Sequence, residues 1–184
     1  MKGVIFNLLE GVVVSEHGPD VWDALLERSG ASGSYSALGS YPDAELLAIV
    51  EAASQTTGAS VPDLLRWFGE RAIPRLRARY PDFFAGHTST ESFLRSLNDV
   101  IHAEVRKLYP GAEVPEFDFD TSEHGEFILI YRSSKQLCAL AEGMLVGAAS
   151  SFGERATVEQ VRCTLRGDDA CHFVCGLVPT TSHA

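Results

Sequence analysis

Residues 125–147, which read GEFILIYRSSKQLCALAEGMLVG, contain the two kinds of local structure that decide the fold class. The first third is rich in β-branched and aromatic residues and predicts a strand, and the rest predicts an apolar helix. Strand alternation would project Tyr131, Ser133 and Lys135 from one face, where two hydroxyls and a cation could bind an anion. The same alternation is common on solvated sheet edges, so the pattern alone leaves both roles open.

The sequence before residue 111 is helical in character. Apolar residues recur there at helical spacing, in segments that end at glycine or proline. Ser60 is positioned as an N-cap of the fourth segment. The predicted helices cover residues 4–14, 20–30, 42–58, 60–81 and 88–111.

The sequence after residue 111 predicts antiparallel strands. Residues 117–122 and 125–133 form one expected hairpin, and residues 157–166 and 170–178 form another around the turn GDD. The long helix, residues 137–152, lies between the hairpins. We therefore expect an α+β protein, a single domain over residues 1–184, with a helical part (1–111) packed on a sheet-plus-helix part (112–184).

Composition excludes several classes of partner. The chain has 184 residues, with 25 acidic against 15 basic side chains and a formal charge of −10. Nucleic acids and anionic membranes attract cationic surfaces, so neither is an expected partner. The N-terminus lacks a cleavage site for a signal peptide, and no segment reaches the ~20 apolar residues of a membrane span. We expect a cytoplasmic protein whose four cysteines are thiols or metal ligands.

His102 lies within the apolar stripe of the segment 88–111, next to Ile101. A histidine at such a position can be a core residue satisfied by a backbone carbonyl. It can also be a neutral imidazole whose Nε2 binds haem iron. Its position alone favours the first role.

The order of several short motifs resembles the haem-nitric oxide/oxygen binding (H-NOX, or HNOB) family, in its bacterial stand-alone form. The resemblance covers essentially the whole chain. Its motifs are MKGVIFNLLE, WFG, LNDVIHAEV, LYPGAEVPEF, YRSSKQLC, EGMLVG and RGDDACHF.

The resemblance implies a haem b group between the helical part and the sheet. It makes His102 the axial iron ligand, and Tyr131 and Ser133 hydrogen-bond donors to the haem propionates. Pro115 corresponds to a proline that packs on the porphyrin face. The family motif ends in arginine where this chain has Lys135, which keeps the charge but not the planar fork that binds a carboxylate through two bonds. We therefore expect weaker haem retention.

The resemblance also describes the distal side, where gas binds. The N-terminal segment with Ile5, Leu8 and Leu9 would wall it. Leu140 occupies the position at which oxygen-binding members carry a tyrosine. The neighbouring side chains cannot donate a strong hydrogen bond either: Ala141, Met144 and Leu145. An apolar pocket favours nitric oxide, with carbon monoxide as a further ligand, over dioxygen.

The cysteines allow more than one role. Cys138, Cys163 and Cys171 match a zinc site of some bacterial members, but Gln160 replaces the usual histidine. Cys175 or His172 could supply the fourth ligand that structural zinc requires. The alternatives are small buried hydrophobic residues or a redox-responsive thiol cluster.

Together these features predict a nitric oxide sensor without catalytic activity. It would signal through changes in His102 ligation to a partner in trans, a histidine kinase or a cyclic-di-nucleotide enzyme. One alternative is a haem-free ligand-binding or scaffold domain, which Lys135 keeps open. The other is a haem peroxidase-like enzyme, which would need a distal histidine or arginine to cleave an O–O bond.

Overall fold

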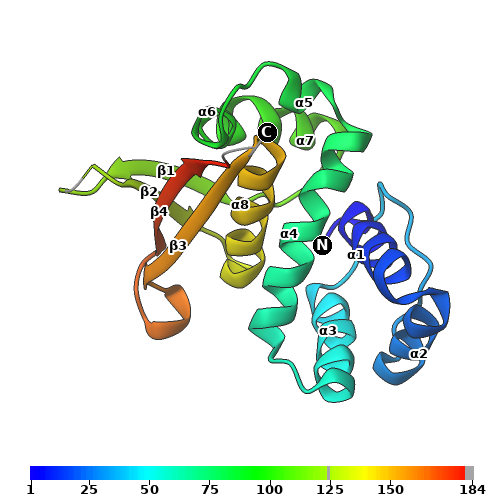
Figure 1. Ribbon diagram of the computed structural model, residues 1–184. Helices are drawn as coiled ribbons and strands as arrows, with labels where there is room; N and C mark the ends of the chain where they lie inside the picture. The colour runs from blue at the N-terminus through cyan, green and yellow to red at the C-terminus, as the bar shows by residue number, and fades with distance from the viewer. Residues whose placement is uncertain (124, 181–184) are drawn as a thin grey trace.

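The computed structural model describes residues 1–123 and 125–180 (Figure 1). His124 in the first predicted hairpin and residues 181–184, which include His183, lie outside the described residues. Within the described chain, no helix combines the length and the apolar character needed to cross a lipid bilayer.

The first four helices agree with the sequence prediction within a few residues. Ser60 caps the fourth as expected, since its hydroxyl accepts a hydrogen bond from the backbone N–H of Asp63. The bounds are α1 Gly3–His17, α2 Pro19–Ser29, α3 Asp43–Thr57 and α4 Val61–Arg79.

The continuous helix predicted over residues 88–111 was wrong. The structure has a short helix α5 (Asp82–Ala85), then α6 (Thr90–Arg95), a π-helical segment (Leu97–Ile101) and α7 (His102–Leu108). Periodicity alone did not reveal the change, because α- and π-helices differ by less than one residue per turn. Single π turns frequently occur at functional sites, and this one ends immediately before His102.

The C-terminal part forms one four-stranded antiparallel sheet in the order β1-β2-β4-β3. The long predicted helix is α8 (Cys138–Ser151). Both predicted hairpins occur, although the end of the third predicted strand is a 3₁₀ turn (Thr164–Arg166). The strands are β1 Glu116–Thr121, β2 Phe127–Arg132, β3 Glu154–Arg162 and β4 Cys171–Pro179.

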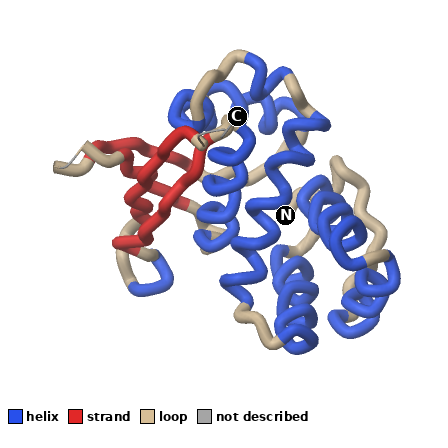
Figure 2. The backbone as a smooth tube through the Cα atoms, viewed as in Figure 1, coloured by secondary structure: helices blue, strands red, loops and turns tan. Residues whose placement is uncertain are grey.

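Helix α8 lies between the sheet and α4, with α1, α2 and α3 beyond α4 (Figures 1 and 2). Helices α4 and α8 approach backbone to backbone at glycines. A Cβ atom added at Gly143 would lie 2.1 Å from the carbonyl oxygen of Arg66, and one at Gly69 would lie 2.4 Å from that of Leu140. The predicted α+β class, with helices packed on an antiparallel sheet, is confirmed.

Candidate functional site

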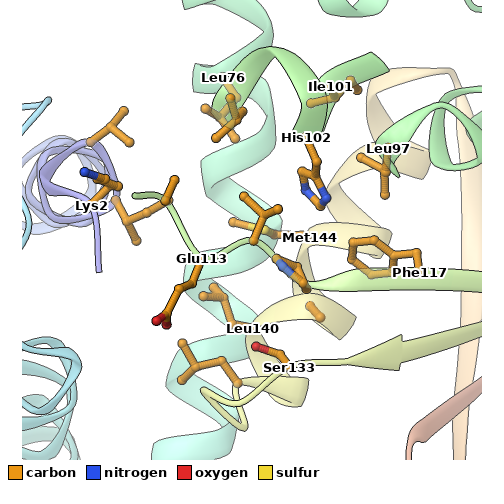
Figure 3. Close-up of a pocket in the computed structure, with 18 of the residues that line it drawn as sticks. Lys2, Leu76, Leu97, Ile101, His102, Glu113, Phe117, Ser133, Leu140 and Met144 are labelled. Carbon is orange, nitrogen blue, oxygen red and sulfur yellow. The ribbon is translucent and has the colours of Figure 1, made fainter. Parts of the chain in front are cut away.

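A cavity of about 460 Å³ lies between the N-terminal helices, α7, α8 and the sheet. Its size is within the range of small-molecule and cofactor sites. Most of its lining is aliphatic or aromatic, and the polar groups are concentrated near the loop after β2. Figure 3 shows side chains from both parts of the chain around it.

His102, the first residue of α7, directs its imidazole into this cavity (Figure 3). Burial, assisted by the charge of Arg106, lowers its pKa from 6.5 to about 4, while the backbone of Pro115 acts in the opposite direction. The ring is therefore neutral at pH 7. Nδ1 is buried, and among the described residues it makes no hydrogen bond of normal geometry, although the Pro115 backbone is close enough to act on the ring. A neutral imidazole keeps a lone pair on one nitrogen, so this ring can serve as a ligand.

The polar end of the cavity differs in geometry from the sequence prediction. Strand β2 ends at Arg132, so Ser133 and Lys135 lie in the following turn and do not share a strand face with Tyr131. All three nevertheless line the cavity. The turn is held by a hydrogen bond from the Lys135 backbone N–H to the Ser133 hydroxyl at 3.2 Å, and Gln136 has a positive φ of 53°.

Lys135 is already paired with two carboxylates. Its Nζ lies 2.7 Å from Asp43 Oδ2 and 3.1 Å from Glu113 Oε2. Burial acts to raise the pKa of Asp43, but hydrogen bonds from Lys135 and the Met1 amine outweigh burial and lower it. These two cations and two carboxylates balance in charge. Lys135 therefore brings less free positive charge to the cavity than the sequence alone suggests.

Lys2 supplies a cation that the sequence analysis missed. It lines the same cavity, and its Nζ donates to the Ser40 hydroxyl at 2.8 Å and to the Pro110 carbonyl at 2.9 Å. No carboxylate pairs with it among the described residues, so its charge is uncompensated. The only signal in the sequence was a basic residue beside the apolar segment 4–14, which does not indicate a cavity.

The aliphatic wall contains most of the residues expected for it. Ile5, Leu140 and Leu145 line the cavity, together with Ala141, Met144 and Pro115. Leu8 and Leu9 do not line it. They lie one turn further along α1 than Ile5 and are buried in the helical core.

Two tyrosines place hydroxyls in a lining that we expected to be aliphatic. Tyr80 and Tyr109 both line the cavity, and their hydroxyl oxygens are 2.9 Å apart. Burial and this contact raise the pKa of Tyr109 to about 12. One hydroxyl donates its proton to the other, so only one of the two protons remains for a ligand.

Phe117 and Asn98 also escaped the sequence analysis. The Phe117 ring lines the cavity between His102 and Tyr131, with both ring centroids 5.7 Å away. Asn98 in the π-helical segment accepts a hydrogen bond from the Phe117 backbone N–H at 3.1 Å, and its amide donates to the Phe117 carbonyl. This pair of bonds attaches the segment before His102 to strand β1.

Of the four cysteines, the structure brings three together. The sulfur atoms of Cys138, Cys163 and Cys171 all lie within 4.8 Å of one another. The Cys175 thiol instead donates to the Phe173 carbonyl at 3.4 Å. Three sulfur donors do not complete the four-ligand set of structural zinc.

The cavity therefore suits a large, mostly apolar group with two further features. One is a metal ion that can accept the lone pair of an imidazole nitrogen, and the other is at least one anionic substituent. A haem meets these requirements: His102 offers the nitrogen, apolar walls enclose the ring, and Tyr131, Ser133 and Lys2 offer donors for carboxylates. Burying such carboxylates without these donors would be costly.

Comparison with known proteins gives a consistent result. The family model described as Haem-NO-binding matches residues 2–160. An H-NOX protein from S. oneidensis in the Fe(II)NO ligation state is 33% identical, with a TM-score of 0.89, and the match covers 97% of this chain and 99% of that one. The Fe(II) unliganded H-NOX protein from K. algicida is 26% identical, with a TM-score of 0.83, and the match covers 100% of both chains.

The H-NOX from Shewanella woodyi, solved in the Fe(II)CO ligation state with IWP-051 bound, is 30% identical. Its TM-score is 0.81, and the match covers 100% of this chain and 97% of that one. The chain described here therefore belongs to the Haem-NO-binding (H-NOX) family, whose members are haem-based gas sensors and not enzymes.

Proposed function

We propose that this chain is a haem b-based nitric oxide sensor, with His102 as the axial ligand. The observation that carries the proposal is a neutral imidazole that projects into an apolar cavity. A protonated imidazole could not bind iron, so the lowered pKa keeps His102 competent as a ligand at neutral pH. Bound haem would supply the iron that takes up the gas.

The residues at the cavity mouth would hold the propionates. Tyr131 and Ser133 offer hydroxyl donors, and Lys2 offers an unpaired charge. Lys135 would contribute less than an arginine, because Asp43 and Glu113 already bind it. The Pro115 ring would contact the porphyrin face.

The aliphatic wall supports nitric oxide rather than dioxygen as the ligand. Leu140, Met144 and Leu145 have no hydrogen-bond donor to stabilise a polar complex with dioxygen. The solved relatives from Shewanella, described in Fe(II)NO and Fe(II)CO states, support the same choice of gases.

The connection of His102 to α7 and the π-helical segment suggests how a change at the iron ligand could be transmitted to the sheet. If the bond to His102 weakens, α7 is free to shift, and the preceding π-helical segment is the part of the helix most easily rearranged. Asn98 would transmit that shift to β1 through its two bonds to Phe117. A partner in trans, a histidine kinase or a cyclic-di-nucleotide enzyme, would respond only if it binds the two states with different affinity.

Absorption spectroscopy tests the proposal. The ferrous, haem-reconstituted chain should show a Soret band that shifts on addition of nitric oxide and forms no stable complex in air. His102→Gly should lose haem or retain it only with added imidazole. His87→Gly is the matched control, because neither His87 nor the Ser92 hydroxyl to which its Nδ1 is hydrogen-bonded lines the cavity.

Two results would contradict the proposal. Unchanged haem retention in His102→Gly would show that another residue is the ligand. A long-lived complex with dioxygen would refute the argument from the aliphatic wall.

A haem-free scaffold is the second candidate, and the ion pairs that occupy Lys135 are the observation in its favour. If no Soret band appears after reconstitution with haem, the haem-free scaffold is the function that remains. The peroxidase alternative is not retained, because the family consists of gas sensors.

A further inference from the structure

Three buried cysteines converge near the N-terminal end of α8, at a distance in sequence from one another. Cys138 is the first residue of α8, Cys163 follows the last residue of β3, and Cys171 begins β4. All three are free and buried, and the Cys138 and Cys163 sulfur atoms are 3.8 Å apart. The gas-sensing proposal does not use this cluster.

A bulge in β3 brings the third sulfur to the inner face of the sheet. The pairing of β3 with β4 shifts register between Gln160 and Arg162. Without a bulge, strand alternation would place Gln160 and Cys163, which are three residues apart, on opposite faces. The extra residue, Val161, lets both side chains lie on the α8 side.

Gln160 stands beside the cluster where a fourth ligand would be. Its side chain lies close to the Cys138 sulfur, and within the described residues its buried amide Nε2 makes no hydrogen bond of normal geometry. A carboxamide is a poor partner for a thiolate-bound metal in either orientation, because its nitrogen has no available lone pair and its oxygen is a hard, uncharged donor. Among the described residues, no fourth cysteine, histidine or carboxylate joins the group.

Hydrogen-bonding groups lie beside the sulfur atom of Cys171. The Thr164 backbone N–H donates to Cys171 Sγ at 3.4 Å, and its hydroxyl lies 3.5 Å from the same atom. Hydrogen bonds of this kind stabilise metal-bound sulfur.

We propose that Cys138, Cys163 and Cys171 form a three-coordinate site for a soft, monovalent metal ion, and that Cu(I) is the ion that fits it. Thiolates are soft ligands that select Cu(I), which accepts three of them in a plane. Zinc in a structural site requires a fourth nitrogen or sulfur donor to complete a tetrahedron. Here the Gln160 amide lies where that fourth ligand would be. Binding would release a proton from each thiol that is protonated beforehand.

Competition for Cu(I) tests the site. The reduced, haem-loaded chain would be titrated under anaerobic conditions against the chromophoric chelator bicinchoninate. We expect one equivalent of Cu(I) to be withheld from the chelator, and Cys163→Ser to weaken binding by on the order of 100-fold. Cys175→Ser is the matched control and should bind as the unsubstituted chain does, because its thiol lies outside the cluster.

Gln160→His gives an independent test that removes no sulfur. It places an imidazole at the fourth corner, so Zn(II) affinity should rise about 10- to 100-fold while one equivalent of Cu(I) is still withheld. Haem absorbance and far-ultraviolet circular dichroism would establish that each variant is folded. The proposal is overturned if the unsubstituted chain yields Cu(I) as readily as Cys163→Ser, or holds Zn(II) as tightly as Gln160→His.

Discussion

At the scale of single residues, the surroundings of a side chain decide its chemistry more than its identity does. His102 and Lys135 were both singled out from the sequence, but their environments change them in different ways. Burial keeps the His102 imidazole neutral, whereas Asp43 and Glu113 form ion pairs with Lys135. Neither effect can be deduced from residue spacing.

The lowered pKa of His102 predicts a dependence of stability on pH in the haem-free chain. The folded pKa of about 4 lies below the unfolded value of 6.5, so the unfolded state binds more protons between these values. The free energy of unfolding should therefore fall as pH falls from 6.5 toward 4, by on the order of 2–3 kcal/mol from this residue.

Urea unfolding at several pH values would measure this effect. His102→Gln should flatten the dependence across that window. His87→Gln, which replaces a histidine that does not line the cavity, is the matched control. An identical pH profile for His102→Gln and the unsubstituted chain would contradict the shift.

Glu113→Gln should slow the loss of haem. The substitution removes one of the two carboxylates that bind Lys135 and leaves its charge freer for the propionates. Because Glu113 is exposed, we expect a modest effect, about two- to fivefold. Transfer of haem to an excess of a scavenging globin measures the rate. Glu104→Gln, which removes an ion pair with Lys107 outside the cavity, is the control, and faster loss in Glu113→Gln would refute the charge argument.

At the scale of elements, regular segments were predicted well and irregular ones were not. Helices α1 to α4 and α8 follow from periodicity and capping residues, since their apolar faces are continuous. The π-helical segment before His102 and the bulge in β3 could not be predicted in this way, because each shifts the periodicity of the apolar residues by only a single residue. Both irregularities orient the side chains of candidate sites.

The close crossing of α4 and α8 predicts a large penalty for a small substitution. Gly143→Ala places a methyl group 2.1 Å from the Arg66 carbonyl oxygen and forces the helices apart. We expect a loss of about 1–3 kcal/mol in the free energy of unfolding, and faster haem loss because α8 carries Leu140 and Leu145.

Gly11→Ala is the matched control for this crossing. It also lies within a helix, but the added methyl would meet nothing closer than 3.8 Å. It should be neutral or stabilising by about 0.5–1 kcal/mol in the same urea experiment. Equal losses in the two variants would argue against a specific close approach.

At the scale of the whole molecule, the helical part and the sheet share their cores. The core of the N-terminal helices includes Leu137 and Leu140 from the C-terminal part. The core beneath the sheet includes Ile73 and Phe93 from the N-terminal part. The cavity lies between the parts and is lined by both.

We propose on this basis that residues 1–184 form a single domain. Residues 1–111 and 112–184, expressed separately, should each lack a cooperative thermal transition, because each would expose core residues that the other covers. Circular dichroism during heating measures this. An equimolar mixture of the two fragments should recover structure and haem binding, and a cooperative transition in 1–111 alone would refute the proposal.

The sequence by itself determined the α+β class, most element boundaries, and the residues that the family resemblance marks, from His102 to the cysteines. These follow from local periodicity, capping and motif order, which a linear chain expresses directly. Only the tertiary structure decided that Lys135 is bound by two carboxylates. Within residues 1–123 and 125–180, it also decided that no carboxylate pairs with Lys2 and that three cysteines meet without a fourth donor. The physical reason is that charge pairing, burial and metal-ligand sets depend on distances between residues far apart in the chain.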